Sequence, residues 1–309
     1  MAAAEQSRTT SEIISQPSSW RRSADAAGAA GGLPRPGERV AVTGCGTSWF
    51  MAQSYAALRE AAGQGVTDAF ASSEFPAGRS YDRVVALTRS GTTTEVLELL
   101  AQVRGTIPTT ALTADPKTPI MDAADELVVL DWADEQSVVQ TRFATSALAL
   151  LRAGLEVHGS LPSGVKSVTE AAVDAETAVS QPLPHAALAA IQWTFLGRGW
   201  TYGLAQEGAL KMREAAGAWT ESYPAMEYRH GPISITGPGR VAWLLGPEPE
   251  GLSGAVARVG GTFVADSASG FDPMADLIRI QRLAVAVAEA KGLDPDHPKN
   301  LTRSVILNG

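Results

Sequence analysis

Short apolar runs alternate along this chain with longer segments in which apolar residues recur at helical spacing. The runs predict strands at 40–43, 84–88, 109–113 and 127–130. The longer segments predict helices at 49–62, 143–157, 203–217 and 277–291, and one that follows the turn at 89–93 and ends at Val103. Strands that alternate with helices of this length indicate βαβ units around a mainly parallel sheet, and therefore an α/β fold.

The second half of the chain repeats the first. The residues at 44, 46, 52 and 53 (Gly, Gly, Ala and Gln) recur at 197, 199, 205 and 206, each 153 residues later. An offset close to half the chain predicts two related α/β lobes. We expect an arm at 1–37 with one short helix near 20–27, a first lobe at 38–160, a linker at 161–184 and a second lobe at 185–309.

Composition excludes several classes of protein. A formal charge of −8 with no basic run disfavours binding to nucleic acid, which needs phosphate neutralisation. The single cysteine, Cys45, excludes an intramolecular disulfide and a cysteine-cluster zinc site, and we expect no metal and no cofactor. The start MAAAEQSRTT does not resemble a signal peptide, and no apolar run approaches the roughly 20 residues of a membrane span. A cytoplasmic protein is expected.

Two turns that follow strands have the composition of phosphate-binding loops. Gly44–Ser48 is a Gly-x-Gly turn before a helix, where free backbone N–H groups and the helix dipole favour an anion. The loop Thr88–Thr93 adds hydroxyl groups and one glycine, without a Walker or dinucleotide pattern. Gly44 and Gly46 would also suit a tight turn without a ligand. The matching stretch of the second lobe, 245–250, is acidic, so only the first lobe is expected to hold phosphate.

The helix at 203–217 carries a candidate base. Glu207, Lys211 and Glu214 are spaced so that they share one face, while a separate apolar stripe would pack on the sheet. An ordinary solvated Glu–Lys pair is the alternative. His230, in Tyr-Arg-His-Gly-Pro, is either a structural or a catalytic histidine.

Five segments that occur in order, at 44–48, 90–93, 207–214, 227–232 and 298–305, resemble motifs of the sugar isomerase (SIS) family. Within it, the sequence is similar to the isomerase half of the glutamine–fructose-6-phosphate aminotransferases and to stand-alone hexosamine-phosphate enzymes. The resemblance starts near residue 12 and covers nearly the whole chain. It implies two lobes, each a three-layer αβα sandwich around a five-stranded, mainly parallel sheet, in a dimer.

The resemblance also implies roles for individual residues. Glu214 matches the carboxylate that moves a proton between C1 and C2, with Lys211 and Glu207 beside it, and His230 matches a ring-opening histidine supplied by the partner subunit. Arg303 stands near the substrate. The positions that match the binding site for the sugar phosphate are Thr47, Ser48, Thr88, Arg89, Ser90, Gly91 and Thr93, and those that match other substrate contacts are Gly46, Val138 and Gln140.

The chain departs from the family pattern at several positions. Arg303 replaces a lysine that forms an imine with the ketose, Arg89 replaces a glutamine, and Gln140 replaces a serine. Arginine stays protonated and cannot form that imine. No glutaminase domain precedes the lobes in this sequence, so the synthase reaction is not expected. The second lobe leaves little room for a strand between Asp266 and the last helix.

We therefore expect an enzyme that removes the C2 proton of a hexosamine 6-phosphate. Expulsion of the C3 hydroxyl, a dehydration of N-acetylglucosamine 6-phosphate, is the leading expectation, because Arg303 keeps a positive charge near an enolate but removes the imine route. Isomerising deamination of glucosamine 6-phosphate and aldose–ketose isomerisation are the alternatives. A sugar-phosphate sensor without catalysis is a further one. The expected assembly is a homodimer with shared sites, and no membrane or nucleic-acid partner is expected.

Overall fold

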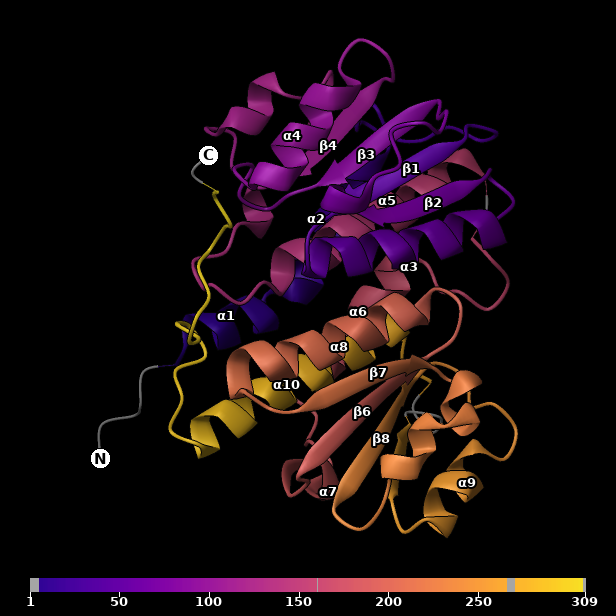
Figure 1. Cartoon of the computed structure of the whole chain (residues 1–309), viewed down its shortest axis with the longest axis vertical. Helices are drawn as coiled ribbons and strands as arrows, with labels where there is room; N and C mark the ends of the chain where they lie inside the picture. Colours follow the sequence, from indigo (N-terminus) through magenta and orange to yellow (C-terminus); the bar gives the residue numbers. More distant parts are fainter. Residues whose placement is uncertain (1–5, 160, 266–269, 308–309) are drawn as a thin grey trace. The chain divides into compact units, whose positions relative to one another are not determined.

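The computed structural model describes residues 6–159, 161–265 and 270–307 (Figure 1). The chain forms two compact units, each built from separated segments. The five-stranded unit comprises residues 18–135, 142–170 and 302–309, and the four-stranded unit comprises residues 1–17, 136–141 and 171–301. In the described part of the chain, no helix is both long enough and apolar enough to cross a membrane.

The five-stranded unit is a parallel sheet in the order β2-β1-β3-β4-β5. Its strands are β1 (Val40–Gly44), β2 (Thr67–Ala71), β3 (Arg83–Leu87), β4 (Thr109–Thr113) and β5 (Glu126–Val129). Every residue of β1, β3 and β4 is buried, as expected for central strands covered on both faces.

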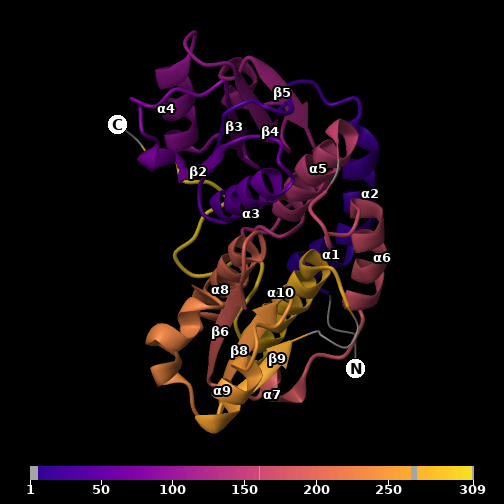
Figure 2. The same cartoon turned by 90° about the vertical axis from the view of Figure 1, so that its right-hand side faces the viewer.

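Helices cover both faces of this sheet. Helix α3 (Thr47–Ala61) leads from β1 to β2, and α4 (Thr94–Val103) leads from β3 to β4 in the opposite direction across the sheet. Right-handed crossovers therefore place the two helices on opposite faces. Figures 1 and 2 show α4 on one face and α3 with α5 (Arg142–His158) on the other. The buried Trp20 of α2 (Gln16–Ala27) donates from Nε1 to Thr145 Oγ1 of α5 at 2.9 Å.

The four-stranded unit has a parallel sheet in the order β7-β6-β8-β9. Its strands are β6 (Gln192–Gly197), β7 (Thr220–Pro224), β8 (Arg240–Leu245) and β9 (Thr262–Ala265). Helices α8 (Thr201–Ala216) and α10 (Pro273–Ala290) pack together on one face, and α9 (Leu252–Arg258) lies on the other (Figure 1).

Shorter helices complete the described elements. They are α1 (Arg8–Ile14), α6 (Val168–Ala178) and α7 (His185–Leu188), and the 3₁₀ turns η1 (Ser72–Glu74), η2 (Pro119–Asp122), η3 (Asp131–Ala133), η4 (Glu227–His230) and η5 (Pro232–Ile235).

The internal repeat is confirmed at the level of the elements. The first four strands of one sheet and the four described strands of the other have the same order, and α3 and α8 occupy matching positions. Gly44 and Gly197 each end the first strand of their repeat, where a Cβ would collide with the start of the next helix. Gly46 and Gly199 both have positive φ, 54° and 57°, which favours glycine.

Three expectations from the sequence need correction. The second sheet has four strands among the described residues instead of five, since a parallel crossover and a further strand need more chain than lies between Ala265 and Pro273. Residues 266–269, where that strand was considered, lie outside the described residues. The strand β2 was not predicted, and the arm at 1–37 contains two helices, α1 and α2, instead of one short helix.

Candidate active site

The two loops with hydroxyl groups start side by side in the five-stranded unit. The register pairs Gly44, the last residue of β1, with Leu87, the last residue of β3. The neighbouring strands β1 and β3 form the point where the strand order reverses, which is where open α/β sheets bind ligands. Helices α3 and α4 both start from these loops, so the positive ends of their dipoles are at the same edge of the sheet.

The hydroxyl side chains at this edge are largely buried. Thr47, Ser48, Thr88 and Ser90 are each less than 8% exposed. Within the described part of the chain, Thr88 Oγ1 is buried and makes no hydrogen bond. A buried hydroxyl without a partner costs stability, and this is commonly offset where it contacts a ligand.

The loop itself is held in a tight conformation. Thr92 donates to Ser90 Oγ from its hydroxyl at 3.0 Å and from its amide at 3.3 Å. Gly91 has φ +64°, and a side chain there would collide with Thr118 and Ile120. The glycine is therefore required by the backbone, and it also brings the hydroxyls of the loop together.

A serine from the end of the chain joins these hydroxyls. Ser304 Oγ lies 3.1 Å from Ser90 Oγ, 2.9 Å from Thr92 Oγ1 and 3.4 Å from Thr93 Oγ1. Ser304 belongs to one of the five motif segments, but the sequence analysis assigned it no role. The structure thus gathers four hydroxyls around one point, a set of neutral donors suited to phosphate oxygens.

Arg89 and Arg303 lie in the same unit as the hydroxyls. The Arg89 guanidinium pairs with the buried Glu135, with Nη1 3.5 Å from Oε2, and donates to the carbonyl of Arg303 at 3.0 Å. The Arg303 side chain pairs with Asp134 and donates to the carbonyl of Glu135. Glu135 was missed by the sequence analysis, because its partner Arg89 lies far away along the chain.

In the four-stranded unit, Lys211 of α8 contacts two carboxylates. Its ammonium lies 3.5 Å from Glu207 Oε1 and forms a short ion pair with Glu214. The side chains of Glu207 and Lys211 are 0% and 1% exposed, whereas that of Glu214 is 19% exposed. The shared face expected from the spacing is therefore present, and it is not an ordinary solvated pair.

The apolar stripe of α8 packs within the four-stranded unit. Leu204 and Met212 are fully buried, and Gly208 brings the helix close to Ile280 of α10 and Phe195 of β6. Helix α10 packs along α8, and most residues of α8 are buried, Glu207 and Lys211 among them.

His230 ends η4 and is exposed. The residues before it anchor the turn: Tyr228 is buried and its hydroxyl bonds to Thr236, and Arg229 donates to the carbonyl of Glu250 at 3.0 Å. An anchored turn with an exposed histidine suits a group that contacts a ligand or another molecule.

Val138 and Gln140 lie in the segment 136–141 of the four-stranded unit. The Val138 amide donates to the carbonyl of Asp296 at 3.2 Å, and the buried carboxylate of Glu12 accepts from the amides of Gln136 and Ser137 at 2.6 and 3.3 Å. Gln140 Nε2 is buried and has no hydrogen-bond partner among the residues described.

The second repeat differs at the matching loops. Thr201 donates its hydroxyl to the carbonyl of Leu245 at 2.8 Å, and the amide of Ser253 in α9 donates to Glu248 Oε1 at 2.8 Å. The loop after β8, residues 246–251, contains glutamates and no hydroxyl group. A carboxylate of the chain itself thus serves the start of α9, where the first repeat offers hydroxyls.

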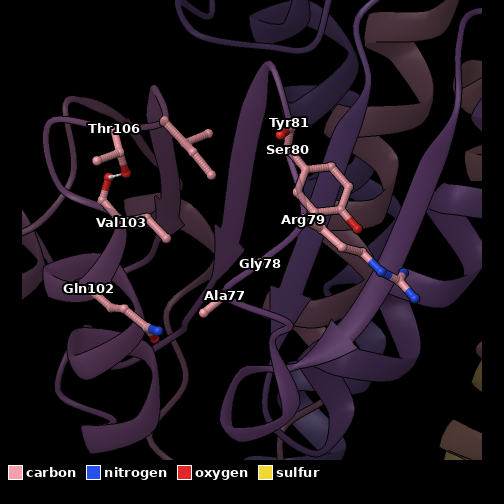
Figure 3. Close-up of a pocket in the computed structure, with 9 residues that line it drawn as sticks. Ala77, Gly78, Arg79, Ser80, Tyr81, Gln102, Val103 and Thr106 are labelled. Carbon is pink, nitrogen blue, oxygen red and sulfur yellow. Dashed lines mark hydrogen bonds between the residues drawn. The ribbon is translucent and has the colours of Figure 1, made fainter.

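A cavity of about 450 Å³ in the five-stranded unit lies away from these residues (Figure 3). It is lined by residues 77–81, before β3, and by Gln102, Val103, Thr106 and Ile107, before β4, and so lies at the amino ends of these strands. None of the predicted site residues lines it. Across the described residues, no group of three or more His, Cys, Asp or Glu side chains is arranged to hold a metal ion.

Comparison with known proteins places the architecture in a class. No protein-family model matches the chain. A glutamine–fructose-6-phosphate aminotransferase (isomerizing) of Caulobacter vibrioides is 28% identical over 87% of the chain, but the chain spans about half (52%) of that protein. The solved structure of a glucosamine-6-phosphate deaminase from Thermotoga maritima superposes with a TM-score of 0.80 at 20% identity, covering 97% of this chain and 100% of the other. A tagatose-6-phosphate ketose/aldose isomerase from Escherichia coli superposes with a TM-score of 0.76 at 18% identity, covering 100% and 98%.

The two parallel α/β units therefore have the fold of these solved structures. The resemblance expected from the motifs is confirmed: the chain is similar in sequence to the isomerase half of the glutamine–fructose-6-phosphate aminotransferases, and similar in fold to the solved structures of a glucosamine-6-phosphate deaminase and a tagatose-6-phosphate ketose/aldose isomerase.

Proposed function

We propose that this chain is an enzyme that binds a hexosamine 6-phosphate through the hydroxyl loops of its five-stranded unit and removes the C2 proton with Glu214. Thr47, Ser48, Thr88, Ser90, Gly91 and Thr93 bind the phosphate in this proposal. Arg89, which the resemblance also matches to the phosphate site, is given a positioning role instead, because its guanidinium contacts Glu135 and the carbonyl of Arg303. Gly46, Val138 and Gln140 contact the sugar, and His230 assists ring opening.

The observation that carries the proposal is the asymmetry of the two carboxylates beside Lys211. Glu207 is fully buried, while the Glu214 side chain keeps 19% of its surface exposed. A general base must reach the proton that it removes, and the exposed surface of Glu214 therefore favours it over Glu207. Lys211 then orients Glu214, and Glu207 holds Lys211.

Removal of the C2 proton from the open-chain sugar leaves an enolate with three possible fates. In our leading proposal, the electron pair forms a C2=C3 bond, the C3 hydroxyl leaves and takes up a proton to become water, and an unsaturated N-acetylhexosamine 6-phosphate results. Arg303 supports this route, because a guanidinium stabilises negative charge but does not form an imine with a ketose.

The second candidate is isomerisation of the hexosamine phosphate with loss of the 2-amino group as ammonia. The deaminase and isomerase names of the similar proteins favour it. It shares the first step, since the same C2 proton moves to Glu214, but it continues with protonation at C1. This leaves an imine at C2, which water hydrolyses to the ketone and ammonia, so a free amino group at C2 is needed.

Proton NMR in D₂O separates the candidates. The chain is incubated with glucosamine, galactosamine, N-acetylglucosamine and N-acetylgalactosamine 6-phosphates, with Glu214→Gln as the matched control. We expect a vinylic proton from an N-acetylated substrate. Ketose and ammonia instead indicate deamination, and a substrate that binds without exchange of its C2 proton contradicts an enzyme and indicates a sensor.

A further inference from the structure

The last residues described, 302–307, lie along the hydroxyl loop of the five-stranded unit. Besides the contacts of Ser304, the carbonyl of Val305 accepts from the Thr94 amide at 3.2 Å, and the Leu307 amide donates to Thr94 Oγ1 at 2.9 Å. The Thr94 amide is the first of α4, so this C-terminal segment binds where the hydroxyl loop meets the start of that helix.

Few contacts fix where this segment lies, because most of it is exposed. Residues 301–303 and 305–307 are exposed, and only Ser304 is half-buried. Apolar burial therefore contributes little here, and polar contacts must determine its position.

Arg303 is held from two sides. Arg89 Nη2 donates to its backbone carbonyl at 3.0 Å, while its own guanidinium contacts Asp134 and the carbonyl of Glu135. The residue that holds the backbone is itself buried: the Arg89 side chain is 5% exposed.

Glu135 balances the charge of Arg89. Its carboxylate is completely buried, lies 3.5 Å from Arg89 Nη1 through Oε2 and accepts from the Arg142 amide at 2.6 Å through Oε1. The amide of Arg142 begins α5, so one end of the pair is attached to a rigid helix. A buried guanidinium without its carboxylate is strongly unfavourable, so loss of either charge displaces the other.

We infer that Arg89 and Glu135 are positioning residues that fix the C-terminal segment so that Ser304 joins the phosphate-binding hydroxyls and Arg303 is held beside them. The expected effects on KM and kcat rest on the proposed function, but the expected position of the C-terminal segment does not. Arg89 thus acts through the segment that it holds, and substrate affinity depends on a pair that need not touch the substrate.

The test compares single variants with a double variant. Glu135→Gln and Arg89→Met each remove one charge of this buried pair and should destabilise the chain. The double variant removes both charges, and because neutral replacement of a buried pair is often harmless, its melting temperature should return close to that of the wild type. The double variant still lacks the donor to the Arg303 carbonyl.

Hydrogen exchange of the Leu307 amide reports the position of the segment, with the Thr67 amide, which donates to Glu60, as an internal control. We expect Leu307 to exchange about tenfold to a hundredfold faster in the double variant, as for a lost hydrogen bond to a charged donor, with Thr67 unchanged. Affinity for inorganic phosphate should fall, and KM for the sugar phosphate should rise more than kcat falls. A double variant with wild-type exchange at Leu307 and wild-type phosphate affinity overturns the inference.

The matched control is the pair at the opposite end of β3. Arg83 Nε lies 3.4 Å from Glu38 Oε2, and both side chains are largely buried. Glu38→Gln should lower the melting temperature without changing exchange at Leu307, and a change there would mean that any lost ion pair loosens the segment, which also overturns the inference. If the wild type turns over no hexosamine phosphate, the proposed function fails, while the exchange experiment still decides whether Arg89 and Glu135 position the segment.

Discussion

At the scale of single residues, Lys211 selects between two carboxylates on α8. Glu207 precedes it by one turn and is fully buried, and Glu214 follows it and remains partly exposed. The spacing alone could not rank the two, since both positions share the same face of the helix. Burial ranks them, because Glu207 has no exposed surface and Glu214 keeps some.

Glu214→Gln should keep substrate affinity and remove both C2 proton exchange and product formation. Loss of a general base typically costs about 10²–10⁴ in rate. Glu207→Gln should cost less and should act through Lys211, which loses a buried partner. Exchange of the C2 proton is measured by NMR in D₂O; a wild-type exchange rate in Glu214→Gln would transfer the role of the base to Glu207.

Cys45 offers a test of burial at the turn after β1. Burial and the charge of Glu95 raise the pKa of its thiol above the ordinary value, although a hydrogen bond with Ser72 acts in the opposite direction. A raised pKa leaves a smaller thiolate fraction at a given pH, and the thiolate is the nucleophile. Alkylation by iodoacetamide should therefore be slower in the folded chain than in urea, with its midpoint at higher pH.

The midpoint in urea is the control for this measurement. If the pH midpoint of alkylation in the folded chain is at or below the midpoint in urea, the thiol is more accessible, or closer to positive charge, than in this structure.

Two residues of the candidate site could not be found from the sequence for a physical reason. Glu135 stands in the polar run Asp-Glu-Gln, which is typical of an exposed loop, and only the fold buries it against Arg89. Ser304 looks like any serine near a chain end until the fold brings it to Ser90 and Thr92. Long-range pairing of this kind leaves no local pattern.

At the scale of elements, the loop between β3 and α4 is a compact set of donors rather than a charged site. Changing Ser90 and Thr93 together to Ala should raise KM for a sugar 6-phosphate. Each lost hydrogen bond to a charged oxygen is worth about 1.5–3 kcal/mol. Thr106→Ala is a matched control, since this hydroxyl only donates to the carbonyl of Val103 in the same unit. A double variant that binds the sugar phosphate as the wild type does would place the phosphate site elsewhere.

The elements that the sequence predicted well are those with a strong local pattern. The strands at 40–43, 84–88, 109–113 and 127–130 agree with β1, β3, β4 and β5 to within about a residue, because each is a short apolar run next to a turn. The strand β2 lies at the edge of its sheet and reads Thr-Asp-Ala-Phe-Ala, so its pattern is weaker. The helix α1 is stabilised by tertiary contacts, such as the hydrogen bond from Thr9 Oγ1 to Asp296 at 2.7 Å. Asp296 is far away along the chain, so the sequence near residue 10 gives no sign of this contact.

At the scale of the whole molecule, each end of the chain belongs to a different unit from the residues that adjoin it in the sequence. Residues 1–17 belong to the four-stranded unit and residues 302–309 to the five-stranded unit. Each unit therefore depends on a segment from the other end of the chain. The net charge of −8 gives no general attraction for a phosphate, so local amides, hydroxyls and the arginines must supply it.

We also propose that the active assembly is a homodimer in which His230 serves the site of the partner subunit. His230 is exposed on an anchored turn, as such a role requires. If the proposal holds, Glu214→Gln and His230→Ala are each inactive alone, but a hybrid dimer of the two contains one site with an intact glutamate from one subunit and an intact histidine from the other. After random exchange of subunits, the mixture should regain roughly a quarter of wild-type activity, since half of the dimers are hybrids with one working site of two.

The controls make this result specific to a shared site. Exchange of subunits is verified with two mass-labelled wild-type preparations. A mixture of Glu214→Gln with wild type gives the activity expected when inactive subunits only dilute the active ones. If His230 acts within its own subunit, a hybrid dimer contains one site without the base and one without the histidine, and no activity returns. Verified exchange without recovery would therefore leave Glu214 as the base but assign His230 to its own chain or to the structure of the turn alone.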